Sequence, residues 1–404
     1  MKILSITAQK PHSTGSGTYL TELVNAWDRS GHEQAVVYGI YRDDSVSFPD
    51  GVKTYPIYFS DGQNVGDISF PIVGMSDVMP YASTRYIDMT DEMILEFESA
   101  FIKQIIAAVD TLNPDIIVCH HLFLLTALVR KHFPERKVVG ICHGTCLRQT
   151  INCEHLRKLI QPYIRELDHV YALHSEQAEN IHKIDNISDD KISIIGSGYN
   201  NQLFNRDGKI EYSAGKPVRI CYAGKMSKAK GIPELLNVLK RLEKDPTVHS
   251  FQATLAGGCT DSEVQTLIDS LNAPFCWLGQ IPQKDLANVY KNNDVFVLPS
   301  FFEGLNLATI EAMASGLIPV CTDLPGMQEW INANVAQPNV RYIPMPDMAT
   351  IDTPSDAGRA RYEQELEGVL RQVIAEVANG RGFNQPDTSS ISWDSVADRL
   401  IQAF

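Results

Sequence analysis

The sequence predicts an α/β protein in which two open, doubly wound parallel sheets follow one another along the chain. Short apolar runs alternate with helical patterns almost throughout the 404 residues. Runs such as 116–119 are continuously apolar, which is typical of a parallel strand that is buried on both faces. A polar, turn-rich segment at 199–217 shows neither pattern and separates two such series.

Twelve strands are expected, with six on either side of the polar segment. Helices are expected between them: Leu20, Leu23 and Trp27 follow the spacing of one buried helix face, and 91–112 repeats a similar spacing. The expected strands are residues 2–6, 35–40, 53–59, 115–119, 137–141, 169–173, 218–223, 251–256, 275–279, 295–299, 318–322 and 340–343.

With the polar segment as the seam, we expect one domain over residues 1–205 and a second over 206–390, followed by a helix over 391–404. Residues 60–90 resist assignment, because they contain several glycines and prolines and show no periodicity. A loop of that length is unusual in a compact domain and is typically functional or mobile.

The composition limits what the protein can bind. There are 35 Lys plus Arg against 49 Asp plus Glu, a formal net charge of −14, which argues against non-specific binding to nucleic acid or anionic lipid. An anionic ligand must therefore be held by a local basic cluster. No apolar run is long enough for a transmembrane helix, and the apolar N-terminal stretch is too short for a signal peptide, so a cytoplasmic protein is expected.

Eight cysteines are too few for a disulfide scaffold in a chain of this length, and we expect them to be reduced. Cys142, His143, Cys146, Cys153 and His155 are metal-ligand residue types, but their spacing lacks the paired cysteines of structural zinc sites. We expect no metal there.

The segment 299–316 predicts a ligand site after a parallel strand. A helix should begin near Leu307 with Asn306 as its cap, and helix N-termini at this edge of a sheet suit phosphates. Glu303 precedes this helix and Glu311 lies inside it, where a carboxylate can accept hydrogen bonds from two ribose hydroxyls. Alternatively, both glutamates only complement the helix dipole.

A second cluster follows the strand at 218–223. Lys225, Lys228 and Lys230 lie between Gly224 and Gly231, in a strand-to-helix turn of an acidic protein. Ammonium groups there could neutralise a diphosphate leaving group. The alternative is a solvated run of charges.

A third cluster, Gly15-Ser16-Gly17, lies between the first strand and the first helix. It fails as a dinucleotide fingerprint, because Leu20 stands where the third glycine belongs. It still permits close approach of a phosphate or sugar to the backbone.

These clusters, in this order, resemble the retaining glycosyltransferases of family 4, whose GT-B fold has two Rossmann-like domains facing across a cleft. The resemblance covers most of the chain. It is carried by Glu303-x7-Glu311, by Gly224-Lys225-x4-Lys230-Gly231, by Gly31-His32-Glu33, by Trp277-Leu-Gly279-Gln-Ile281-Pro282, by Ile195-Gly-Ser-Gly198-Tyr-Asn200, by His143-Gly144 and by Trp393 in the last helix.

The resemblance implies a nucleotide-diphosphate sugar as donor, UDP-sugar foremost, bound mostly by the C-terminal domain, while the N-terminal domain takes the acceptor and is rejoined by the last helix. Transfer would retain the anomeric configuration, need no metal or other cofactor, and serve glycan biosynthesis. The implied catalytic residues are His143, Lys225, Lys230 and Glu303. The implied donor-binding residues are Gly15, Ser16, Gly17, Gly224, Gly279, Ile281, Asn306, Leu307, Ala308 and Glu311.

Two departures from the family pattern affect this site. Lys225 replaces the usual arginine and loses its planar two-pronged contact with a diphosphate. Asn306 replaces the more common glycine or proline, which would alter contacts to the sugar or phosphate. His120 and His121 also follow a strand, and a functional role is less strongly indicated for them than for His143.

Three alternatives remain. A nucleotide-sugar epimerase would turn over the donor without an acceptor, and a non-catalytic GT-B sugar-binding protein would show no turnover. A nicotinamide-dependent oxidoreductase would use Asp43 or Asp44 to bind the ribose of its cofactor. The missing third glycine of the dinucleotide fingerprint argues against this alternative. The sequence leaves the donor base, the transferred sugar, the acceptor and the oligomeric state open; we assign residues 60–90 to the acceptor as a hypothesis.

Overall fold

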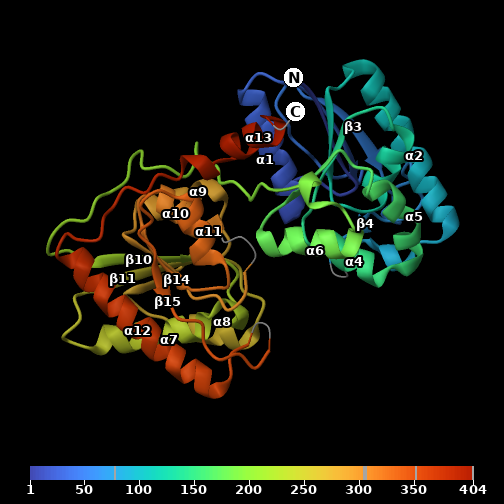
Figure 1. Ribbon diagram of the computed structural model, residues 1–404. Coiled ribbons are helices and arrows are strands. Elements are labelled where there is room, and N and C mark those ends of the chain that lie inside the picture. Colours follow the sequence, from blue (N-terminus) through green and yellow to red (C-terminus); the bar gives the residue numbers. More distant parts are fainter. Residues whose placement is uncertain (77–78, 304–306, 351–352, 403–404) are drawn as a thin grey trace. The chain divides into compact units, whose positions relative to one another are not determined.

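The chain forms two compact units in the computed structural model, which describes residues 1–76, 79–303, 307–350 and 353–402 (Figure 1). Unit 1 comprises Met1–Ser197 with Trp393–Phe404, and unit 2 comprises Gly198–Ser392. The division at 197/198 thus falls eight residues before the predicted 205/206. The reason is packing, because Phe204 is fully buried in the core of unit 2 and Tyr199 bonds through its backbone to Ile391.

Unit 1 is built on a parallel sheet in the order β3-β2-β1-β6-β7-β8-β9. The order reverses between β1 and β6, whose register pairs Ile3 with Ile116. The strands are β1 (Lys2–Thr7), β2 (Glu33–Ile40), β3 (Lys53–Tyr58), β6 (Ile116–His120), β7 (Val138–Ile141), β8 (His169–Ala172) and β9 (Ile192–Ile194). The helices are α1 (Gly15–Arg29), α2 (Asp91–Leu112), α3 (Leu124–His132), α4 (Thr145–Asn152), α5 (Glu154–Ile164), α6 (Ser175–Asp185) and α13 (Trp393–Gln402), with a 3-10 turn η2 (Asp189–Lys191).

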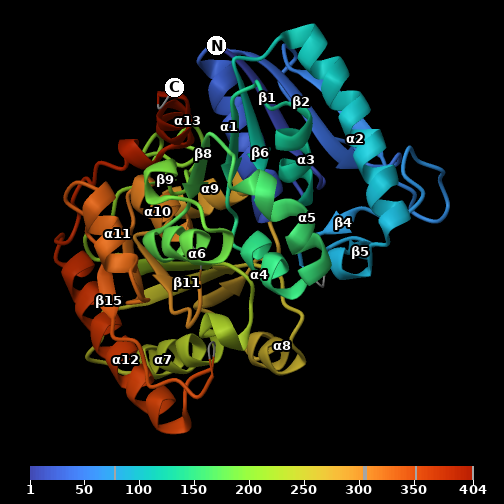
Figure 2. The same ribbon diagram turned by 45° about the vertical axis from the view of Figure 1, so that its right-hand side comes forward.

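Helices cover both faces of this sheet, as the continuous apolar strands require. Leu4 and Ile117 point into the core beneath α2 and α3, while Ile3 and Ile116 point toward α1 and α13. Figures 1 and 2 show α13 lying along α1, where the indole of Trp27 donates a hydrogen bond to the carbonyl of Ala397 at 3.1 Å. The last helix therefore belongs to unit 1.

Residues 60–90 do not form the long unstructured loop that the sequence predicts. They contain a small parallel pair, β4 (Val73–Gly74) and β5 (Thr84–Arg85), followed by the 3-10 turn η1 (Tyr86–Asp88). The apolar side chains Ile68, Ile72 and Tyr86 are fully buried in the core of unit 1. These strands have two residues each and are too short to show a period, so they could not be predicted from the sequence.

Unit 2 has a six-stranded parallel sheet in the order β12-β11-β10-β13-β14-β15, which reverses between β10 and β13. The strands are β10 (Val218–Ala223), β11 (Phe251–Ala256), β12 (Phe275–Trp277), β13 (Val295–Leu298), β14 (Ile318–Thr322) and β15 (Arg341–Ile343). The helical elements are η3 (Lys228–Lys230), α7 (Ile232–Lys244), α8 (Ser262–Asp269), α9 (Gln283–Lys291), α10 (Leu307–Ala314), α11 (Met327–Asn334), α12 (Asp356–Ala378) and η4 (Ser389–Ile391). Figure 1 shows α7 and α12 side by side on one face of the sheet and α9, α10 and α11 on the other.

All twelve predicted strands are confirmed, with ends that differ by two residues at most. The prediction missed β9, a three-residue edge strand in which Ile194 is 53% exposed. Within the described part of the chain, every helix is too short or too polar to span a bilayer.

Candidate functional site

The strongest cluster of unit 2 lies where the loops after β10 and β13 meet. These strands flank the point at which the sheet order reverses, and ligands of such sheets bind beyond the carboxyl ends of the strands there. The amide of Phe301 donates to the carbonyl of Ala229 at 2.9 Å and joins the two loops. Gly231 has a φ of +64°, and a Cβ at this position would come within 2.1 Å of the Pro299 carbonyl oxygen. The loops thus pack backbone against backbone.

This packing brings Lys230 and Glu303 together. The Lys230 ammonium lies 2.7 Å from Oε2 of Glu303 and donates to the Phe302 carbonyl at 3.1 Å. The Ser300 hydroxyl donates to the other carboxylate oxygen, Oε1, at 2.8 Å. An ammonium group has three N–H donors, so one remains for a ligand. Both side chains keep about a fifth of their surface exposed, 24% and 18%, so a ligand can reach them.

The other two lysines of this segment differ. Lys228 is exposed and pairs with Glu263 at 2.6 Å, a hydrogen bond that raises the pKa of Lys228. Lys225 is also exposed, and its backbone carbonyl accepts a hydrogen bond from the Tyr222 hydroxyl at 2.9 Å. Among the three lysines, the structure therefore brings only Lys230 to Glu303.

The turns after β10, β11 and β12 are joined through glycines. The amide of Gly224 donates to Ala256, and that of Gly257 donates to the carbonyl of Gly279 at 2.7 Å. Gly279 has a φ of +68° with open space around its Cα, and Ile281 is half-buried beside it. Gly224 and Gly279 thus lie on the same edge of the sheet. The sequence analysis did not single out Gly257, whose amide joins the turns after β11 and β12. The Gly257-Gly258 pair directly after a strand could have indicated it.

The predicted residues of α10 lie in its first turns. Leu307, Ala308 and Glu311 are half-buried. Burial, followed by the charge of Glu311, raises the pKa of the Tyr290 hydroxyl. Asn306, predicted as a helix cap and donor contact, lies outside the described residues.

In unit 1, the glycine cluster forms the first turn of α1, not a loop ahead of it as predicted. Gly15 is exposed, whereas Gly17 is buried and its amide donates to the Thr14 hydroxyl at 3.1 Å. The Ser16 hydroxyl donates to Oε1 of Gln9 at 3.2 Å. The side chain of Thr14 therefore caps this helix. This cap was not predicted from the sequence, where only the glycines and Ser16 were singled out.

His143 follows β7 and lies in a cluster of rings. Its Nε2 is 3.1 Å from Nδ1 of His120, and the two rings stack with a centroid distance of 5.3 Å. The rings of His121 and Tyr19 lie 4.8 and 5.2 Å from it. Burial holds the pKa of His143 well below its ordinary value and lowers that of His120 to about 3. Both imidazoles are therefore neutral near pH 7.

All eight cysteines are free thiols, and Sγ of Cys142 lies 3.5 Å from Sγ of Cys146. Among the residues that the structure describes, no group of three or more His, Cys, Asp or Glu side chains is arranged to hold a metal ion.

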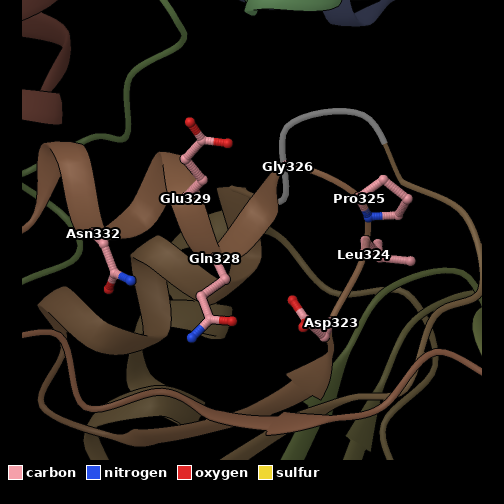
Figure 3. Close-up of a pocket in the computed structure, with 7 residues that line it drawn as sticks. All are labelled: Asp323, Leu324, Pro325, Gly326, Gln328, Glu329 and Asn332. Atoms are coloured by element: carbon pink, nitrogen blue, oxygen red, sulfur yellow. The ribbon is translucent and has the colours of Figure 1, made fainter.

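A separate pocket of about 440 Å³ lies beyond the end of β14 (Figure 3). Its side chains include the carboxylates of Asp323 and Glu329 and the amides of Gln328 and Asn332. Its remaining lining residues are Leu324, Pro325 and Gly326. Among the residues that the structure describes, its lining includes no basic side chain and none of the predicted site residues, so this lining does not suit a diphosphate.

Two family models match consecutive parts of the chain. The model described as Glycosyltransferase Family 4 matches residues 13–203, and the model described as Glycosyl transferases group 1 matches residues 205–341. The two matches follow the order of units 1 and 2.

Two relatives show how far sequence similarity extends. The O-antigen chain mannosyltransferase B of Escherichia coli is 28% identical over 187 residues, which are 45% of this chain and 44% of that protein. An uncharacterized glycosyltransferase of Methanocaldococcus jannaschii is 27% identical over 362 residues, which are 83% of this chain and 84% of that protein. The chain thus spans less than half of the first relative and most of the second.

Solved structures share the fold over the whole chain. Sucrose-phosphate synthase from Thermosynechococcus elongatus, 17% identical, matches with a TM-score of 0.63 over 100% of this chain and 98% of that chain. Anabaena HepE in complex with UDP and glucose, 14% identical, matches with a TM-score of 0.57 over 100% and 99%.

The two Rossmann-like parallel sheets give the chain the GT-B fold of these solved structures, and the two family models identify it as a glycosyltransferase. With both family models matched in order, it belongs to the family 4 type of these glycosyltransferases.

Proposed function

We propose that the protein is a retaining glycosyltransferase that moves a hexosyl group from a nucleotide-diphosphate sugar, with UDP-sugar as the foremost candidate, to an acceptor hydroxyl. One observation carries the proposal: Lys230 and Glu303 meet at 2.7 Å at the reversal point of the unit 2 sheet. A cation and a carboxylate side by side suit the two ends of the reacting bond, the diphosphate and the sugar. The UDP and glucose bound by HepE support the same donor class.

Lys230 is proposed to stabilise the departing diphosphate. Two of its N–H donors are engaged by Glu303 and Phe302, which fixes the ammonium and leaves the third for a phosphate oxygen. The exposed Lys225 would add a second positive charge to the same group. Charge placed before the reaction stabilises the leaving group without reorganisation cost at the transition state.

Glu303 is proposed to contact the donor sugar near its reacting carbon. Its two oxygens already accept from Ser300 and Lys230, so the carboxylate is held in one orientation and retains lone pairs for sugar hydroxyls. Glu311 would hold the two ribose hydroxyls, and the backbone at Gly279 and Ile281 would face the nucleotide base. Gly224 and the first turn of α10, with Leu307 and Ala308, would lie along the phosphates, a part also proposed for Asn306.

In the proposed reaction, the bond between the anomeric carbon and the diphosphate oxygen breaks, and a bond to the acceptor oxygen forms on the same face of the sugar. The acceptor proton passes to the leaving diphosphate. Lysine charge would do the work of a metal, so the reaction is proposed to be metal-independent. In unit 1, Gly15, Ser16 and Gly17 would contact the phosphates and His143 a sugar hydroxyl.

A thermal-shift panel of UDP, GDP, ADP and their common sugars, with and without EDTA, tests the donor class. A ligand at one hundred times its Kd stabilises a protein by about 2.7 kcal/mol, a shift of several degrees. We expect one nucleotide to stabilise the protein selectively and equally with EDTA. The stabilisation should vanish in a Lys230→Ala, Glu311→Ala double variant that keeps its own unliganded transition.

Absence of a shift with every nucleotide would overturn the donor assignment and favour a non-catalytic sugar-binding protein. A shift that EDTA abolishes would instead overturn metal independence. Turnover of the donor sugar into its epimer without acceptor would replace the transferase by an epimerase.

A further inference from the structure

His143 is bonded to another histidine through one of its two ring nitrogens. Its Nε2 lies 3.1 Å from Nδ1 of His120, so one of the two atoms must carry the proton that the other accepts. Nδ1 of His143 makes no hydrogen bond to the residues that the structure describes, and the His143 side chain is only partly buried. Nδ1 is therefore the atom that His143 can offer to a ligand.

The surroundings of His120 distinguish the two possible arrangements. Its Nε2 is buried and has no hydrogen-bond partner among the described residues. If that nitrogen carried the proton, a buried N–H donor would stay unpaired, which is more costly than an unpaired ring acceptor. The favoured arrangement places the proton of His120 on Nδ1, from which it donates to His143.

We propose that His120 is a positioning residue that fixes the tautomer of His143, so that His143 presents Nδ1–H as a neutral hydrogen-bond donor to a hydroxyl of the transferred sugar. This inference deepens the proposed function and rests on it for the identity of the ligand. A neutral donor suits the site, because glycosyl transfer builds positive charge on the sugar ring, which an imidazolium would repel.

The ring cluster also fixes where His143 points. Tyr19 packs edge-on against His143, and its hydroxyl donates to the carbonyl of Gly196 at 2.9 Å. On its other side, Tyr19 contacts Trp393, the first residue of α13, at a centroid distance of 4.7 Å. His143 is thus held between His120 and a tyrosine that the C-terminal helix supports.

Nitrogen-15 NMR of the histidine side chains in the free, full-length protein tests the tautomer without any donor or activity. Signals are assigned by their loss in His143→Asn and His120→Asn, with the exposed His155→Asn as a control for indirect shifts. We expect His143 to carry its proton on Nδ1 and His120 on Nδ1 at pH 7. A proton on Nε2 of His143 would overturn the inference and leave the proposed function untouched.

A second arm uses hydrolysis of UDP-glucose, the transfer to water. His120→Leu removes the donor, so His143 should become a mixture of tautomers and kcat should fall about tenfold, with KM for UDP-glucose within about twofold. His120→Asn keeps an N–H donor near the position of Nδ1 and should restore kcat to within about threefold of the original protein. Equal losses in both variants with an unchanged His143 tautomer would contradict a positioning role. Failure of the original protein to bind or hydrolyse any nucleotide sugar would count against the proposed function. The NMR result would be unaffected by this failure, because it is measured on the protein without a donor.

Discussion

Lys230 and Glu303 form an ion pair of 2.7 Å even though one residue follows β10 and the other follows β13. The parallel sheet places these two strands side by side, so the ends of their loops meet at one point of its carboxyl edge. Ser300 and the Phe302 carbonyl add one further hydrogen bond to each partner, Ser300 to Glu303 and Phe302 to Lys230. Unit 2 thus holds a fixed cation beside a fixed carboxylate.

Replacing Lys230 should weaken binding of a nucleoside diphosphate. Loss of one charge-assisted hydrogen bond predicts a roughly 10- to 100-fold higher Kd for UDP in Lys230→Met, measured by calorimetry at fixed ionic strength. Lys228→Met is the matched control, because Lys228 belongs to the same short turn but pairs with Glu263. Its Kd should stay within about twofold. Equal effects of both variants would mean that the lysines act only through general charge.

Glu311 should determine how strongly the protein prefers a nucleotide that carries both ribose hydroxyls. If its carboxylate accepts from two ribose hydroxyls, the protein should bind UDP roughly 10- to 100-fold more tightly than 2′,3′-dideoxy-UDP. Glu311→Ala should reduce this preference to about twofold or less. Competition against a fluorescent UDP analogue measures both ligands in both proteins. An undiminished preference in the variant would remove Glu311 from the ribose site.

Two glycines with nearly the same backbone angle should differ in their tolerance of a side chain. Gly231 and Gly279 have φ values of +64° and +68°, but only at Gly231 would a Cβ meet backbone, the Pro299 carbonyl oxygen at 2.1 Å. Gly279→Ala should cost about 1 kcal/mol from the backbone angle alone. Gly231→Ala should cost about 1–3 kcal/mol more, because the loop after β13 must move. Urea unfolding of the two variants checks the difference; similar losses would mean that the loops are not packed this closely.

Asp185 should make stability depend on pH. Burial, followed by the nearby Cys146, raises the pKa of Asp185 to about 7, and neither carboxylate oxygen has a partner among the described residues. A raised pKa in the folded state means that its favourable contribution is complete below the unfolded value near 4 and is lost as the pH rises to about 7. Asp185→Asn should therefore gain stability over the original protein between pH 4 and pH 7, and the gain should then level off. Titration of His120 and His143 cancels in this comparison, since both proteins contain them. A difference in Tm that is independent of pH would contradict the shift.

The sequence was sufficient for the twelve expected strands because most of them are short, largely apolar runs, as strands buried in a parallel sheet are. It was insufficient for 60–90, where β4 and β5 have two residues each and the burial of Ile72 and Tyr86 depends on contacts far away in the chain. Periodicity carries no information about such contacts.

The candidate site, too, could be predicted from the sequence only in part. The residue types and spacing singled out Lys230 and Glu303, but their pairing depends on the order of β10 and β13 in the sheet. The sequence could not distinguish Lys228, whose partner Glu263 lies on another helix. Nor could it reveal the bond between His120 and His143, because that bond joins the ends of β6 and β7.

Transfer of glucose from UDP-glucose to water, followed by proton NMR, tests the central claim most directly. A retaining reaction at the Lys230–Glu303 pair should release α-glucose first, before mutarotation mixes the anomers, and release should be equally fast with EDTA. Lys228→Met should behave like the original protein, and Lys230→Met should be at least about tenfold slower. If UDP-glucose gives no turnover, the same assay uses the nucleotide sugar that the stability panel selects. Initial release of the β-anomer, or an unchanged rate in Lys230→Met, would contradict the account.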